Sequence, residues 1–199
     1  MKIALISFSD SNGGAAYACV DIHKNFNKNK ISSSLILREK KLNIKNSILF
    51  GNRFINTIRN KFIYFFMRLI GSNNFSLNIL PSNLNSFLKY KKFDLINCHW
   101  INGETISLDE LKKIKIPIIF TLHDEWLLLG GQHYKNSINF KKNKILSIFE
   151  KRLIRIKKKL LKKENVFIVA PSVWLYKEAL RNKYIDNKRV FHIPYYLII

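Results

Sequence analysis

Cysteine is scarce in this sequence of 199 residues, which excludes a disulfide framework. Only Cys19 and Cys98 occur, and they do not form a C-x-x-C pair. Long hydrophobic runs are also missing. The first nine residues lack the apolar core and cleavage site of a signal peptide, and the most lipid-like stretch, 62–70, is too short to span a bilayer and contains Arg68. We therefore expect a protein of the reducing cytoplasm.

Acidic residues are few as well. The sequence has 13 Asp and Glu against 35 Lys and Arg, so its formal net charge is +22. Such a charge suits an anionic membrane surface or a nucleic acid as partner. Codon bias is an alternative explanation, because Lys, Asn and Ile share AT-rich codons and all three are abundant. No RRM, KH, zinc-finger or helix-turn-helix signature is present, so nucleic acid is the less favoured partner.

Short apolar segments alternate with helical patterns along the chain, and 47% of the residues are hydrophobic. This alternation predicts a Rossmann-like, doubly wound α/β fold with a parallel sheet. The segment 71–85, rich in Asn and Ser, is expected to be a surface loop. The expected strands are 3–8, 34–37, 94–99, 117–122, 166–170 and 190–193, and the expected helices are 15–28, 52–70, 107–113, 144–163 and 173–181.

Polar residues and glycines follow several of the predicted strands, at the edge where such folds bind ligands. Gly13 and Gly14 follow the first strand, where a tight turn and a helix N-terminus suit an anionic group. The spacing is not G-x-G-x-x-G, so a dinucleotide fingerprint is absent and an ordinary turn is the alternative. His123 and Asp124 follow a later strand, where the imidazole suits proton transfer or a hydrogen bond to a sugar or phosphate.

Other residues of this predicted edge have two possible roles. Trp126 either stacks on a sugar ring or caps the core, and His99 either lines the crevice or packs. Gly130 and Gly131 form a second glycine turn before His133. The histidines lack the spacing of metal ligands, so we expect no metal site.

Two helical segments combine basic and apolar residues, as membrane-surface helices do. The first, 52–70, mixes Arg and Lys with phenylalanines, and the second, 144–163, carries a basic face. For the second, the alternative is an amphipathic crossover helix with a solvated basic face. Its expected apolar stripe is Ile145, Ile148, Phe149, Leu153, Ile156 and Leu160.

A series of short motifs occurs in a fixed order along nearly the whole chain. They are Gly13–Ala16, Phe75–Asn78, Asn97–Gly103, Thr121–Trp126, Gly130-Gly131 before His133-Tyr134, Val169–Leu175 and Ile193-Pro194. In this order and spacing they resemble the family 4 glycosyltransferases of bacterial cell-surface polysaccharide synthesis. The resemblance implies a GT-B architecture, in which an N-terminal Rossmann-like domain binds the acceptor and a second domain binds a nucleotide sugar.

The resemblance also implies the chemistry, which is sugar transfer with retention of configuration and without metal or other cofactor. It implies that Gly13 and Gly14 lie near the donor phosphates and that His123 is the catalytic group facing sugar and acceptor. Asp124 and Trp126 would support that loop. The acceptor would be a cell-surface glycan or a lipid-linked sugar, used at the cytoplasmic face of the inner membrane.

The chain departs from the family pattern in three places. Tyr17 stands where relatives often carry Arg, and no cysteine cluster follows His133. The donor-binding domain has no counterpart before the sequence ends at Ile199. We therefore expect residues 1–199 to be the N-terminal half of a GT-B fold, inactive unless a separate chain supplies the donor half. The alternative is a non-catalytic remnant, or a basic membrane-surface module of the same fold.

Overall fold

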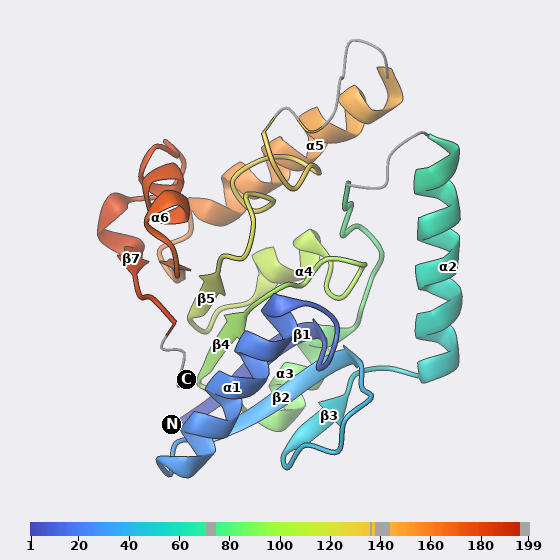
Figure 1. The fold of residues 1–199 in the computed structure, drawn as a ribbon. Helices are drawn as coiled ribbons and strands as arrows, with labels where there is room; N and C mark the ends of the chain where they lie inside the picture. Colours follow the sequence, from blue (N-terminus) through green and yellow to red (C-terminus); the bar gives the residue numbers. More distant parts are fainter. Residues whose placement is uncertain (71–74, 136, 138–143, 196–199) are drawn as a thin grey trace.

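The protein is an α/β fold built on one sheet of seven parallel strands (Figure 1). The computed structural model describes residues 1–70, 75–135, 137 and 144–195. The strand order is β3-β2-β1-β4-β5-β6-β7. The strands are β1 (Lys2–Ser9), β2 (Ser32–Glu39), β3 (Ser47–Leu49), β4 (Leu95–Cys98), β5 (Ile118–Thr121), β6 (Val166–Ala170) and β7 (Val190–His192).

The order of the strands reverses direction at β1. Ile6 of β1 pairs with Ile36 of β2 on one side and with Cys98 of β4 on the other. In an open parallel sheet, ligands bind outside the carboxyl ends of the strands at this switch point. The predicted Rossmann-like, doubly wound class is therefore confirmed, and the fold itself points to the edge where β1 and β4 end.

Within the described residues, six α-helices connect the strands (Figure 1). They are α1 (Gly14–Lys28), α2 (Arg53–Leu69), α3 (Leu84–Lys91), α4 (Leu108–Lys113), α5 (Lys144–Leu161) and α6 (Val173–Leu180), and a 3-10 turn, η1 (Asn187–Arg189), precedes β7. Helix α4 is capped by Ser107, whose hydroxyl accepts a hydrogen bond from the Glu110 N–H. Within the described part of the chain, no helix is both long and apolar enough to cross a bilayer.

The two faces of the sheet are covered differently. On one face, α1 packs Cys19 and Val20 against Leu35 and Leu37 of β2. The other face buries the larger core, to which the remaining helices contribute side chains such as Leu153 of α5. On the α1 face of β4, β5 and β6, side chains remain only partly buried; these are Asn97, Ile119, Phe167 and Val169.

The structure corrects three expectations. Strand β3 and helix α3 were not predicted, because each is short and its sequence lacks a clear period. The segment 71–85 is not a surface loop over its described part: Phe75, Leu77 and Asn78 are buried. Residues 71–74 lie outside the described residues. On α5, Ile145 and Ile148 of the expected stripe are exposed, while other residues of this helix, Leu146, Glu150 and Lys157, are buried.

Candidate functional site

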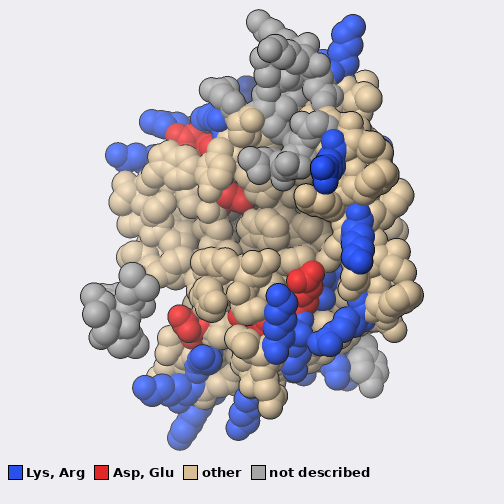
Figure 2. Space-filling view, turned by 45° about the vertical axis from the view of Figure 1, so that its right-hand side comes forward, with Lys and Arg blue, Asp and Glu red and all other residues tan. Residues whose placement is uncertain are grey.

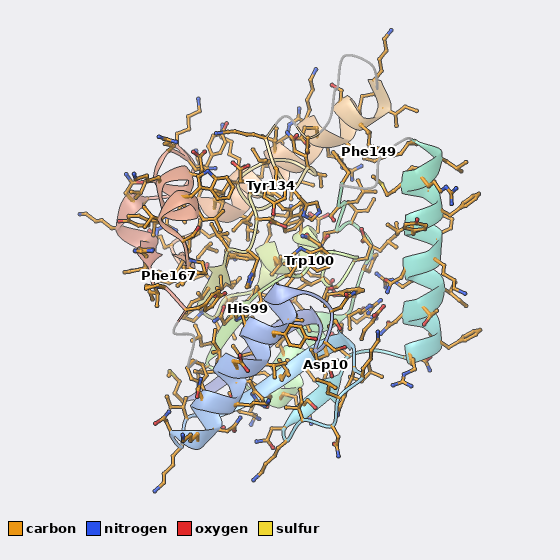
Figure 3. The ribbon with its side chains drawn as sticks, in the orientation of Figure 1. Asp10, His99, Trp100, Tyr134, Phe149 and Phe167 are labelled. Carbon is orange, nitrogen blue, oxygen red and sulfur yellow. The ribbon has the colours of Figure 1, made fainter. Side chains whose placement is uncertain are left out.

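Two histidines meet where β4 and β5 end. His99 directly follows β4, and His123 follows β5 by two residues. His99 Nδ1 lies 3.1 Å from His123 Nε2, and the ring centroids are 5.3 Å apart. His99 is 5% exposed, and its Nε2 is buried without a partner (Figure 3). Parallel strands therefore bring two residues 24 apart in sequence into a single hydrogen-bonded pair.

Burial keeps this pair uncharged. Desolvation, with a smaller contribution from His123, lowers the pKa of His99 to about 3. Desolvation also lowers the pKa of His123 to about 4, although neighbouring Asp124 opposes the shift. At neutral pH both imidazoles are neutral, so each offers one donor and one acceptor nitrogen. The pair suits hydrogen bonds to hydroxyl groups better than charge pairing with an anion.

Tyr195, which the sequence did not mark as a site residue, reaches the same pair. Its hydroxyl lies 3.3 Å from His123 Nε2, and the two rings stack with centroids 5.9 Å apart. Burial is the main cause that raises the pKa of Tyr195 above its ordinary value, so the phenol stays protonated. Tyr195 comes after β7, far from His123 in sequence. The contact could not be predicted, because no local motif indicates it.

A second chain of hydrogen bonds runs beside the histidine pair. Asp124 Oδ2 lies 2.6 Å from His133 Nδ1, and His133 Nε2 lies 2.9 Å from Ser76 Oγ. The same carboxylate oxygen accepts a bond of 3.2 Å from Trp100 Nε1, and the Trp100 and His133 rings stack 6.0 Å apart. The structure thus joins three predicted strand-end segments, and it adds Ser76 from the segment expected to be a loop.

The glycine turn is held from behind by α5. The Glu150 carboxylate accepts the N–H groups of Gly130 and Gly131 at 3.0 and 2.6 Å. The buried Lys157 ammonium donates to the carbonyls of Trp126 and Gly130 and lies 3.5 Å from the Trp126 ring centroid. Trp126 is itself buried and donates to the Ser76 carbonyl. Trp126 and the two glycines therefore support the loop that carries His123 and His133.

The sequence analysis did not identify the two α5 residues that hold this turn. Glu150 and Lys157 stand seven positions apart, which is two helical turns, so they share one face of α5. That spacing was the only feature of the sequence that could have pointed to a shared role. It is hard to recognise in a basic helix with many lysines. Desolvation lowers the pKa of Lys157, while Glu150 and Asp124 act in the opposite direction.

An open cavity of about 370 Å³ adjoins the second chain. Trp100, Ser76 and His133 form one wall, α2 forms the opposite wall, and Asn12 and Glu39 contribute polar atoms. Among the described residues, its lining contains no Lys or Arg despite the charge of the protein. Two carboxylates line it, Glu39 and Glu104. Aromatic faces with neutral hydrogen-bonding groups and carboxylates are surroundings that suit a sugar ring.

Gly13 and Gly14 lie next to this cavity through their neighbour Asn12. Gly13 has a φ of +86° and precedes α1, and its carbonyl accepts the N–H groups of Ala16 and Tyr17. A Cβ at either glycine would meet no atom within 4 Å. The first turn of α1 is thus open to a ligand, which fits the predicted position near an anionic group.

The cysteines and the third histidine complete the list of candidates. Cys19 and Cys98 are both buried and unpaired by disulfide, and burial raises the pKa of each thiol. Among the described residues, no three His, Cys, Asp or Glu side chains converge as a metal-binding group. His133 belongs to the hydrogen-bond chain with Asp124 and Ser76, whereas His123 contacts His99 and Tyr195.

Solved structures with a similar fold were compared with the chain. No protein-family model and no curated protein sequence matches the chain. HepE (Alr3699) of Anabaena in complex with UDP-glucose aligns with a TM-score of 0.57 at 14% identity, over 98% of this chain and 43% of its own. HepE with UDP and glucose gives 0.55 at 13%, over 99% and 45%. The lipopolysaccharide outer core galactosyltransferase WaaB gives 0.47 at 13%, over 96% and 44%.

These neighbours are GT-B glycosyltransferases, and at such low identity the likeness establishes the fold alone. The class defined here is a Rossmann-like α/β fold of the kind found in GT-B enzymes, with polar side chains gathered at its switch point. The chain spans less than half the length of the neighbours that it matches.

Proposed function

We propose that this chain is the acceptor-side half of a retaining glycosyltransferase of family 4 type. It would transfer a sugar from a nucleotide sugar to a cell-surface glycan or lipid-linked acceptor, as a cytoplasmic enzyme peripheral to the inner membrane. The fold supports the proposal, because the neighbouring HepE structures hold UDP-glucose, or UDP and glucose. The motif order supports family 4, and a second, donor-binding domain would complete the enzyme.

The observation that carries the proposal is the uncharged histidine pair together with a cavity whose described lining holds no Lys or Arg. A neutral His123 accepts a hydrogen bond from a hydroxyl or donates one, and it needs no counter-ion. The two histidines do not line this cavity, but their sequence neighbours Trp100 and Asp124 belong to the hydrogen-bond chain beside it. The cavity offers the Trp100 face and the Ser76 hydroxyl. We assign the acceptor sugar to this cavity and the reacting hydroxyl to the side nearest His123.

The remaining residues would position the substrates. Gly13 and Gly14 place the open first turn of α1 towards the donor phosphates, where main-chain N–H groups stabilise negative charge. Asp124 orients His133, and His133 orients the Ser76 hydroxyl towards the cavity. Most of the rate would then come from holding acceptor hydroxyl and donor sugar in line, so one half of the site alone should do little.

Turnover of sugar nucleotides tests the proposal. The polypeptide is incubated with UDP-sugars and lipid-linked or glycan acceptors, first alone and then with a GT-B donor domain supplied as a separate chain. We expect negligible transfer alone and measurable transfer when both halves are present. Robust turnover by the polypeptide alone would refute the acceptor-half assignment.

The role of His123 is tested in the reconstituted enzyme. His123→Ala is expected to lower kcat by about 10²–10⁴-fold, the range for a positioned acid or base. His192→Ala is the matched control, because His192 is exposed on β7. If His123→Ala leaves kcat unchanged, His123 takes no part in the mechanism.

A further inference from the structure

Arg38 is a buried cation, two of whose nitrogen atoms have no hydrogen-bond partner in the described part of the chain. It is the seventh residue of β2 and is 3% exposed, and its Nε and Nη2 atoms are buried without a hydrogen bond. Among the described residues, no carboxylate forms an ion pair with it. An unpaired buried charge destabilises a fold. Such a residue needs an explanation outside the stability of the fold.

The surroundings of Arg38 are basic and open to solvent. Arg38 lines a cavity of about 490 Å³ between the end of β2, β3 and the first turns of α2. Three more cations line it, Lys40, Lys41 and Arg53, against a single carboxylate, Glu39. Burial, and then the nearby Arg59, lowers the pKa of Arg38 to about 10, with Glu104 and Glu110 opposing the shift. The guanidinium is therefore charged at neutral pH.

Two of these cations already contact carbonyl groups, and Glu39 is also engaged. Lys40 Nζ donates to the Ser47 carbonyl at 3.1 Å, and Arg53 Nη2 donates to the Lys40 carbonyl at 3.0 Å. The Asn60 side chain donates to Glu39 at 3.1 Å. These bonds fix the cations around the cavity but leave their charges uncompensated. The cavity is thus set up for an anion with several oxygens, which is the geometry of a phosphoryl group.

Helix α2 continues from this cavity with an unpartnered apolar stripe. Successive helical residues turn by about 100°, so side chains three and four apart share one face. On α2 the outward face carries large apolar residues, each 51–73% exposed: Phe54, Ile55, Ile58, Phe62, Phe65 and Leu69. The inward face is held to the body by Asn56, by Met67 and by a contact of 6.3 Å between the Phe66 and Phe149 rings.

A basic edge separates the two faces of α2. Arg53, Lys61 and Arg68 are exposed and lie on the side of the helix that faces neither the stripe nor the core. In Figure 1, α2 stands at the right-hand border of the molecule, and Figure 2, which turns this side forward, shows many more blue than red side chains. Apolar stripe and basic edge together are the pattern of a helix that lies in a membrane interface.

We propose that α2 docks on an anionic phospholipid surface and that the Arg38 cavity binds the phosphoryl group of one lipid headgroup. The apolar stripe enters the acyl boundary, and the basic edge lies at headgroup level. The phosphate lies against the Arg38 guanidinium, which lines the cavity, and compensates its charge. A lipid fits better than a free phosphate, because the apolar stripe and the anion site adjoin each other on α2. Lipid binding of this kind needs no sugar transfer.

Vesicle flotation tests the proposal with the chain itself. We expect binding to phosphatidylcholine vesicles that contain phosphatidylglycerol and little binding to phosphatidylcholine alone. The double variant Phe62→Gln and Phe65→Gln should weaken binding by at least about tenfold. Arg38→Gln should weaken it about fivefold, the worth of one charge at a lipid surface. The matched control, Ile145→Gln with Ile148→Gln, removes exposed apolar residues from α5 and should bind like the wild type.

Thermal unfolding distinguishes a lost site from a lost fold. Arg38→Gln should unfold at the same temperature as the wild type or higher, because it removes an unpaired buried charge. Vesicle binding that is unchanged in the α2 and Arg38 variants, or reduced only in the α5 variant, would overturn the assignment. So would tight binding of inorganic phosphate or glycerol 3-phosphate without binding to vesicles, which would assign the cavity to a free ligand. Because the assay measures no turnover, it can succeed or fail independently of the proposed transferase.

Discussion

The Asp124 carboxylate holds the His133 imidazole in one orientation through a contact of 2.6 Å between Oδ2 and Nδ1. A carboxylate only accepts, so in the neutral imidazole Nδ1 carries the proton and Nε2 is left as an acceptor. The Ser76 hydroxyl, 2.9 Å from Nε2, must then donate to His133. Its lone pairs remain free for a ligand in the adjoining cavity. One carboxylate therefore sets the polarity of a wall to which three distant segments contribute.

Asp124→Asn tests this arrangement. The carboxylate accepts from the Trp126 N–H on one oxygen and from Trp100 Nε1 and His133 Nδ1 on the other, and an amide keeps only one acceptor oxygen. His133 therefore loses its fixed orientation, and Ser76 loses its orientation with it. In the reconstituted enzyme we expect kcat/KM for the acceptor to fall by about 10–100-fold, or about 1.4–2.7 kcal/mol. Donor binding, measured by UDP titration, should stay the same. A loss confined to donor binding would contradict the assignment of this wall to the acceptor.

Lys157 is expected to stabilise the loop behind the site. Lys157→Met keeps the length of the side chain but leaves the Trp126 and Gly130 carbonyls without their donor. We expect the free energy of unfolding to fall by about 2–4 kcal/mol, measured by urea denaturation. Lys159→Met changes an exposed lysine of the same helix and should stay within about 0.5 kcal/mol of the wild type. Equal stability of both variants would show that the buried amine contributes nothing.

We expect alanine substitutions at two glycines of the site to have opposite effects on the free energy of unfolding. A Cβ at Gly131 would lie 2.2 Å from the Phe75 ring, whereas a Cβ at Gly14 would meet open space. Gly131→Ala should therefore lower the free energy of unfolding by about 1–3 kcal/mol. Gly14→Ala should leave it unchanged or raise it slightly, and should weaken donor binding if the first turn of α1 contacts the phosphates. Thermal unfolding and UDP titration of both variants give the answer.

The fold was readable from the sequence because its central strands are continuous apolar runs between helices of normal length. The runs from Ile3 and from Val166 form strands as expected, and the expected helix 15–28 appears as α1. Strand β3 was not predicted, because a strand of three residues is too short to show a hydrophobic period. Local patterns therefore determined the order of the elements but not the short pieces at the sheet border.

The site was predicted only where strand ends define it. His99 and His123 each follow a strand, so their meeting depends on the sheet alone. Tyr195, Ser76 and Lys157 join the site through contacts between segments that are far apart in sequence, and composition carries no trace of such contacts. The sequence shows that α2 has an apolar face. It does not show that this face is exposed, because exposed and buried apolar faces have the same period.

The histidine pair makes the protein sensitive to acid. The folded state holds the pKa values of His99 and His123 at about 3 and about 4, whereas an unfolded histidine titrates near 6.5. Between those limits the unfolded state binds more protons than the folded state. The free energy of unfolding is therefore not reduced by these histidines above pH 6.5, and it falls as the pH drops, by up to about 1.4 kcal/mol per pH unit for each histidine.

Urea denaturation at pH 7, 6 and 5 should show this slope. His99→Gln should reduce it, while His192→Gln, which changes an exposed histidine, should not. If the His99→Gln slope equals that of the wild type, the acid sensitivity has another origin.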